Sequence, residues 1–160
     1  MQPDILRTVS VLKDLTDEEM ELFAGLLTPY EAEPGYKILA EGAEVTALYI
    51  VCGGVVHVRR LAQTREMLLG RMGVGAFFGE INLFDPGVAT ASVYAMNTVL
   101  LGVISYEQMR LFMHTNPAAG YKIVSSMMTE MSRRLRQTSA RLVNTVYWSG
   151  NEANVPGQSS

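Results

Sequence analysis

The spacing of apolar residues changes twice along the chain and divides it into three parts. Near the start, apolar residues recur on one helical face: Met20, Phe23, Leu26 and Leu27. From Tyr30 to Val103 the apolar runs are short and separated by glycines, which is typical of strands and turns. A helical spacing then returns and continues to about Trp148. The pattern predicts an α+β domain, mainly β, over residues 1–148, with N-terminal helices, strands over about 30–103 and C-terminal helices over about 105–148.

Local signals indicate where the helices begin. Two pairs have the spacing of a capping box: Thr16 with Glu19, and Ser105 with Gln108. Asn116 and Pro117 are typical of an N-cap followed by a first-turn proline. We therefore expect a helix over Tyr106–Thr115 and a longer one to about Trp148. The polar residues 149–160, with glycine and proline among them, are expected to form a disordered tail.

The last helix carries a heptad stripe of residues spaced alternately by four and three: Val124, Met128, Met131, Leu135, Thr138, Leu142 and Thr145, with Val146 able to replace the last. A helix of roughly 45 Å is longer than a domain of this size can cover. A second copy of the chain is the expected partner, giving a two-fold dimer. The alternative, in which the stripe packs on the chain's own strands, stays open for the first two turns.

The composition indicates a globular domain that does not bind polyanions over its whole surface. The chain has 160 residues, of which 48% are apolar and 18% charged, and its net charge is −3. It contains a single cysteine, Cys52, and no signal-like or 18-residue apolar run, so we expect a reduced, cytoplasmic protein without a membrane span. Cys52 ends a strand-like run before a Gly-Gly turn, which favours a packed thiol over a nucleophile.

The stretch Phe77–Ala95, FFGEINLFDPGVATASVYA, is the strongest candidate for a ligand site. It reads as a tight turn into a few helix-capable residues, then a loop and an apolar strand. At Gly79 the backbone can approach a ligand without a Cβ, and the start of a short helix offers N–H groups to an anion such as phosphate. Glu80 places a hydrogen-bond acceptor at the same point, and this acceptor suits sugar hydroxyls.

This stretch resembles the phosphate-binding cassette of the cyclic-nucleotide-binding domains, and the resemblance extends from about Leu12 to Trp148. The glycine pattern matches as well, and the resemblance implies a double-stranded β-helix, the jelly-roll or cupin-like β-roll. It assigns the ribose 2′-hydroxyl to Glu80 and the cyclic phosphate to amides at Gly79 and around Thr90 and Ala91. Further cassette positions expected at the ligand are Phe78, Ile81 and Ala89. An arginine that pairs with the phosphate in the family is replaced by Ala89 here.

Arg60 is a candidate for the missing positive charge. Strand alternation places it on the same face as Val56 and Val58, and in the family this face lines the nucleotide pocket, where Leu69 is also expected. The alternative is that the strand ends at Val58 and Arg60 bends into solvent.

A second motif, MSRRLRQTSARL in the long helix, resembles the dimerisation helix of the catabolite-activator type. The resemblance implies that Thr138 and Ser139 reach the adenine, one from each protomer. Arg134 lies one turn before Thr138 and is expected to contact Glu80 or the phosphate. Taken alone, Thr138 could instead be a polar residue that sets the coiled-coil register. We expect the arginines of this helix to form a solvated ion-pair face rather than a DNA contact, and we expect no helix-turn-helix domain in this chain.

These observations lead to three hypotheses. The first is a regulatory module that binds a cyclic nucleotide, cAMP in preference to cGMP, and transmits binding through the dimer helix, with no cofactor and with a downstream partner protein possible. The second is a degenerate domain that acts as a dimerisation or interaction scaffold without nucleotide. The third is a metal-dependent enzyme of cupin type, which is disfavoured because His57 and His114 lack metal-ligand spacing.

Overall fold

The strands form two antiparallel sheets that pack as a β-roll. The computed structural model describes residue 1 and residues 3–152. Its strands are β1 (Thr28–Ala32), β2 (Lys37–Leu39), β3 (Ala47–Gly53), β4 (Val56–Ala62), β5 (Arg65–Met72), β6 (Phe77–Phe78), β7 (Ser92–Ala95) and β8 (Val99–Ser105). One sheet has the order β1-β8-β3-β6 and the other β2-β7-β4-β5. This arrangement confirms the predicted roll with N-terminal helices and a long C-terminal helix.

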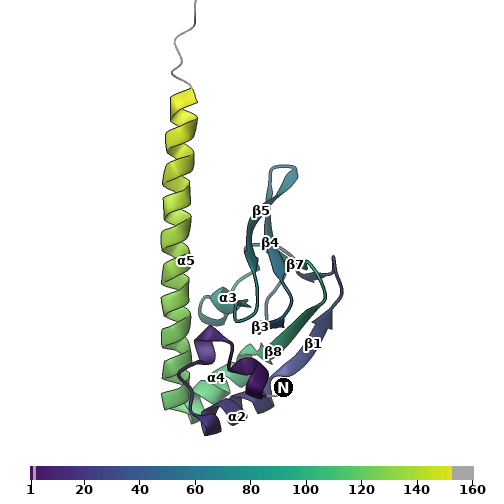
Figure 1. Cartoon of the computed structure of the whole chain (residues 1–160), viewed down its shortest axis with the longest axis vertical. Helices are drawn as coiled ribbons and strands as arrows, with labels where there is room; N and C mark the ends of the chain where they lie inside the picture. Colours follow the sequence, from purple (N-terminus) through teal and green to yellow (C-terminus); the bar gives the residue numbers. More distant parts are fainter. Residues whose placement is uncertain (2, 153–160) are drawn as a thin grey trace, which may run out of the picture.

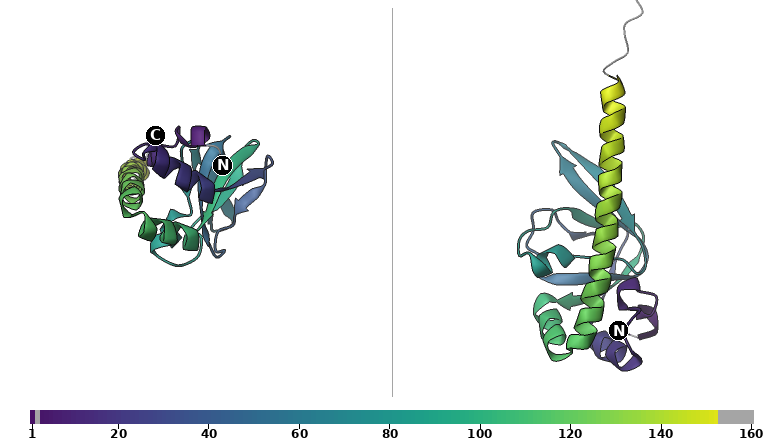
Figure 2. Two further views of the ribbon diagram at one scale, coloured as in Figure 1. Left: turned by 90° about the horizontal axis from the view of Figure 1, so that it is seen from below. Right: turned by 90° about the vertical axis from the view of Figure 1, so that its left-hand side faces the viewer.

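The helices lie at one end of the roll and along one side of it. They are α1 (Pro3–Leu6), a 3₁₀ turn η1 (Ser10–Leu12), α2 (Asp17–Leu26), α3 (Glu80–Phe84), α4 (Tyr106–Thr115) and α5 (Pro117–Glu152). Figures 1 and 2 show α2 and α4 around the start of α5, which then runs beside the roll and continues past it. Both predicted capping boxes are present, at Thr16 and at Ser105. Among the described residues, no helix is both long and apolar enough to span a bilayer.

The apolar core has two parts. Between the sheets lie residues such as Val51, Val56, Phe78 and Leu101. The larger part joins the roll to the helices and includes Phe23, Phe77, Met109, Ile123 and Met127. The burial of Ile123 and Met127, which lie one turn apart, fixes the first half of α5 on the domain.

The face of α5 that contacts the domain is not the predicted heptad stripe. Ile123 and Met127 are buried, whereas their neighbours Val124 and Met128 are half-buried and exposed. Met131 packs against the chain's own core, so the packing alternative holds at this position. Three other stripe positions are open: Met128, Leu135 and Leu142 are 61%, 68% and 63% exposed.

Both ends of α5 differ from the expected details. The helix continues to Glu152, so residues 149–152 are helical rather than part of a tail. The remainder of the predicted tail, residues 153–160, lies outside the described residues. At the start, Asn116 directly precedes Pro117 as predicted, and its carbonyl accepts a hydrogen bond from Gly120 N–H. Its side-chain amide also donates to the Phe112 carbonyl of α4, a contact that was not expected.

Adjacent residues of α4 provide a test of this packing. Phe112 is 3% exposed and meets the ring of Phe23 edge-on at 5.2 Å, whereas Leu111 is 61% exposed. We expect Phe112→Ala to lower the free energy of unfolding by about 3 to 5 kcal/mol because it leaves a cavity. Leu111→Ala should change it by less than about 0.5 kcal/mol. Urea denaturation measures both, and equal losses would contradict the described orientation of α4.

Candidate ligand site beside Glu80

Gly79 places Glu80 at the start of α3 through a backbone conformation that other residues rarely adopt. Its φ is +83°, and a Cβ at this position would lie 2.6 Å from the Ala47 carbonyl oxygen. Only glycine therefore fits without displacing the β3 backbone. The turn directs Glu80 inward, where it is 7% exposed.

Arg134 of α5 is the cation that meets the buried carboxylate. Its Nη1 lies 3.5 Å from Glu80 Oε1, and Nη1 and Nη2 each donate to the Phe77 carbonyl at 3.2 Å. Its Nε donates to Glu130 Oε1 at 3.1 Å, and the guanidinium lies 4.7 Å from the centroid of the Phe77 ring. Arg134 therefore ties α5 to the cassette through a carboxylate, a carbonyl and a ring.

Burial governs the ionisation of Glu80. Removal from water raises the pKa of the carboxyl, while the Glu80 backbone N–H and the charge of Arg134 act in the opposite direction. The net direction is upward, so Arg134 compensates only part of the desolvation. A further hydrogen-bond donor from a ligand would find the carboxylate incompletely satisfied.

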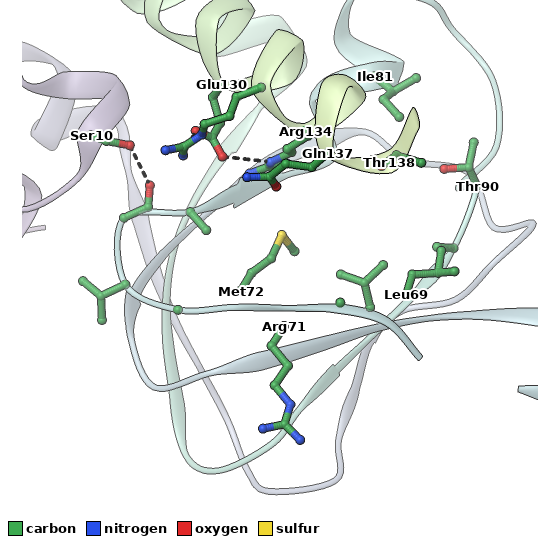
Figure 3. A pocket seen from close by; sticks show the side chains of 18 of the residues that line it. Ser10, Leu69, Arg71, Met72, Ile81, Thr90, Glu130, Arg134, Gln137 and Thr138 are labelled. Carbon is green, nitrogen blue, oxygen red and sulfur yellow. Dashed lines mark hydrogen bonds and ion pairs between the residues drawn. The ribbon is translucent and has the colours of Figure 1, made fainter. Parts of the chain in front are cut away.

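Two adjoining cavities lie beside this pair. The smaller, of about 130 Å³, contains Glu80 and Ala89 in its wall, and the larger, of about 680 Å³, lies between α5 and the β4–β5 hairpin. Val58, Thr90 and Arg134 line both, so the two cavities share part of their wall. Figure 3 shows Arg134, Gln137 and Thr138 across the larger cavity from Met72 and Leu69, whereas Arg71 points away from it.

The structure brings almost all of the predicted site residues to these cavities. The smaller is lined by Phe78, Gly79, Glu80, Ile81, Ala89, Thr90, Ala91, Val58 and Arg134. The larger adds Arg60, Leu69 and Thr138. Ser139 is exposed on α5 and lines neither cavity of its own protomer.

Glu130 is a functional candidate that the sequence analysis missed. It lines the larger cavity and accepts hydrogen bonds from both Arg133 and Arg134. Its position four residues before Arg134 is the helical spacing of an ion pair, and this signal could have identified it.

The position of Arg60 agrees only in part with each of the two predictions, a pocket-facing strand residue or a residue bent into solvent. Strand β4 continues to Ala62 rather than ending at Val58, and Arg60 pairs across the strands with Met67 on β5. A bulge at Leu69 offsets the pairing between Val58 and Arg59. Arg60 lines the larger cavity, yet its side chain is 62% exposed and its Nε lies 3.6 Å from Glu41 Oε1.

The residues considered for other chemistry lie apart. Cys52 is buried, which raises the pKa of its thiol, so it is a poor nucleophile. His57 is on β4 and His114 on α4. Within residues 1 and 3–152, no three His, Cys, Asp or Glu side chains come together as a metal site.

Comparison with known protein families assigns the fold. Residues 30–116, more than half of the chain, match the family model described as "Cyclic nucleotide-binding domain". The chain belongs to this family.

Individual proteins are also similar to this chain in sequence or structure. A "CRP-like cAMP-activated global transcriptional regulator" of Mycobacterium tuberculosis is 28% identical over 97% of this chain and 66% of its own length. The crystal structure of the Thermus thermophilus catabolite activator protein is 25% identical, with a TM-score of 0.76 over 86% of this chain and 63% of that one. The regulatory subunit of a cAMP-independent protein kinase A from Trypanosoma brucei, 22% identical, gives a TM-score of 0.70 over 86% of this chain and 49% of that one.

The chain therefore spans less than two thirds of the length of the first relatives that it matches. At the cassette, this family member carries a buried Ala89 whose backbone N–H donates to the Ala43 carbonyl.

The raised pKa of Glu80 predicts a stability effect of defined sign. Between the ordinary carboxyl pKa of 4.5 and the raised folded value, the folded state binds more protons than the unfolded state, so stability falls as the pH rises through this window. Glu80→Gln cannot ionise and should unfold at a higher temperature than the wild type above the window. The difference should shrink below pH 4.5.

Glu66 is the matched control for this measurement. The Tyr94 hydroxyl and Arg59 lower the pKa of its carboxyl, so Glu66→Gln should be less stable than the wild type at neutral pH. The difference should vanish as the pH falls through the folded pKa, because the wild type loses this stabilisation there. Thermal melts over a pH series measure both variants. Destabilisation of Glu80→Gln at neutral pH would contradict the described burial.

Proposed function

We propose that the chain is a regulatory, non-catalytic module that binds a cyclic nucleotide in the two adjoining cavities beside Glu80, with cAMP preferred to cGMP. The observation that carries the proposal is the buried Glu80 carboxylate, held by Gly79 at the tip of α3 and facing a guanidinium. A carboxylate accepts from ribose hydroxyls, and the adjoining 680 Å³ is of the size that encloses small-molecule ligands. The family and the cAMP-activated relatives support this choice.

The positive charge for the phosphate would come from arginines outside the cassette. Ala89 offers only a methyl group, whereas Arg134 lines both cavities and Arg60 lines the larger one. Both already have carboxylate partners, Glu80 and Glu41, and a bound phosphate would compete with these for the same donors. We therefore expect weaker binding than in members that carry the cassette arginine.

Binding would reach the rest of the protein through α5. Thr138 lines the larger cavity and Arg134 contacts the cassette, so a ligand would exchange contacts with one face of this helix. A ligand changes the equilibrium between two helix arrangements only through its difference in affinity for them. We propose that the purine contacts Thr138 in one protomer and Ser139 of the partner.

The exposed stripe on α5 supports a homodimer. Met128, Leu135 and Leu142 are spaced by seven, and all three are exposed in the single chain. A second copy of the same helix would bury them in a two-fold interface. A cytoplasmic location and a downstream protein partner remain parts of this proposal.

Calorimetric titration with cAMP and cGMP measures the proposed binding. The wild type is expected to bind, and Ala89→Arg to bind about 10- to 100-fold more tightly, because a hydrogen bond to a charged group contributes about 1.5 to 3 kcal/mol. Val88→Arg is the control, since Val88 is exposed and lines neither cavity. The proposal would be refuted if the wild type gave no heat and no thermal shift at millimolar ligand.

The dimer is tested separately by sedimentation. Leu135→Glu places a charge in the apolar stripe and should convert the protein to monomers. Ala140→Glu adds the same charge at an exposed position on the opposite side of the stripe and should leave the dimer intact. Wild-type protein that sediments as a monomer at high micromolar concentration would exclude the proposed pairing.

A second function, a dimerisation scaffold without nucleotide, is favoured by one observation. Arg134 already pairs with Glu80 and donates to the Phe77 carbonyl, so the site without ligand has a cation of its own in place. The fold alone does not decide between the two functions: one solved structure with this fold is the regulatory subunit of a protein kinase A described as cAMP-independent, and it is a triple mutant with cAMP bound. The scaffold predicts a dimer by sedimentation together with no heat in either titration.

A further inference from the structure

Helix α4 holds both ends of α3 through two side chains that do not line the ligand cavities. The Tyr106 hydroxyl donates to the Gly79 carbonyl, and Arg110 Nη2 donates to the Leu83 carbonyl at 3.0 Å. Tyr106 and Arg110 are one turn apart on α4, just as Gly79 and Leu83 are four residues apart in the cassette. The two hydrogen bonds therefore run side by side from one helix face to the other.

Helix α3 depends on such outside contacts. It has five residues, and a helix of this length is not stable on its own. The Leu83 carbonyl lies in its last turn, where no intrahelical N–H is available, and Arg110 supplies the missing donor. The Gly79 carbonyl precedes Glu80 directly, so its direction helps to set where the carboxylate points.

The two donors are themselves well placed. Tyr106 is buried, and burial together with the nearby Glu80 charge raises the pKa of its hydroxyl to about 12, so it stays a donor at physiological pH. The Arg110 guanidinium lies 6.0 Å from the centroid of the Tyr106 ring. Arg110 is exposed at the surface, and its loss would leave no cavity in the core.

We propose that Tyr106 and Arg110 are positioning residues that set the affinity for the nucleotide by fixing α3 and Glu80, without contacting the ligand. This inference rests on the proposed function, because it names residues that tune the same site. It places the control of affinity partly on α4, a helix that joins the β-roll to α5 at Asn116.

The variants Tyr106→Phe, Arg110→Met and the double substitution test the inference by cAMP calorimetry and thermal unfolding. Each single variant is expected to weaken binding about three- to tenfold. Arg110→Lys keeps a donor and should stay within about twofold of the wild type. The controls are Tyr94→Phe and Arg7→Met, which remove hydrogen bonds to Glu66 and Asp17. Neither residue lines a ligand cavity, so both variants should leave the affinity unchanged.

A merely structural role would lower the melting temperature without changing the affinity of the folded fraction. Titrations are therefore performed at least about 15 °C below the melting temperature of each variant. The amide signals of residues 79–84 are followed by NMR in ligand-free protein, where the positioning role predicts shifts that the control variants do not show. Should Tyr106→Phe fail to fold, Arg110→Met and Arg110→Lys still decide the question.

The outcomes separate the two proposals. If the wild type binds and Arg110→Met and Tyr106→Phe bind equally well, the positioning role is overturned and the proposed function stands. If the wild type binds neither cAMP nor cGMP, the proposed function is overturned and the positioning role with it.

Discussion

The arrangement of this site depends on one buried carboxylate, that of Glu80. Burial of Glu80 would be strongly unfavourable without a compensating cation, and the compensating group, Arg134, comes from a residue 54 positions later in the chain. The same guanidinium also holds the Phe77 carbonyl. The position of α5 along the roll is therefore coupled to the geometry of the cassette.

The sequence predicts what is decided locally. Capping boxes at Thr16 and Ser105 involve residues three positions apart, and both form as expected. The choice of the buried face of α5 is not local. In the run KIVSSMMTEM, Ile123 and Met127 form one apolar stripe and Val124 and Met128 the next, so periodicity alone cannot show which one meets the β-roll.

The same distinction applies to the site. The residues of the cassette were predicted from a resemblance that extends along contiguous sequence, and the structure places them around one pair of cavities. The environment of Arg60 depends on two features that cannot be predicted from local sequence. One is a bulge at Leu69 on the neighbouring strand, and the other is the approach of Glu41 from a separate loop. Asn116 precedes α5 as its sequence context predicts, but the donation from its amide to the Phe112 carbonyl depends on α4 ending at the same residue.

The substitution at the cassette arginine bears on switching as well as on binding. A ligand that takes Arg134 must replace the contacts of this residue with Glu80 and the Phe77 carbonyl, so the exchange of hydrogen bonds yields little net free energy. Driving a two-state helix equilibrium from 1:99 to 99:1 requires a differential affinity of about 10⁴-fold. A cassette arginine adds a phosphate contact that competes with no existing bond to α5, whereas the methyl group of Ala89 adds none. In the proposed complex, the free energy for moving α5 would then come from the purine end of the ligand, which the proposal places at Thr138 beside the larger cavity.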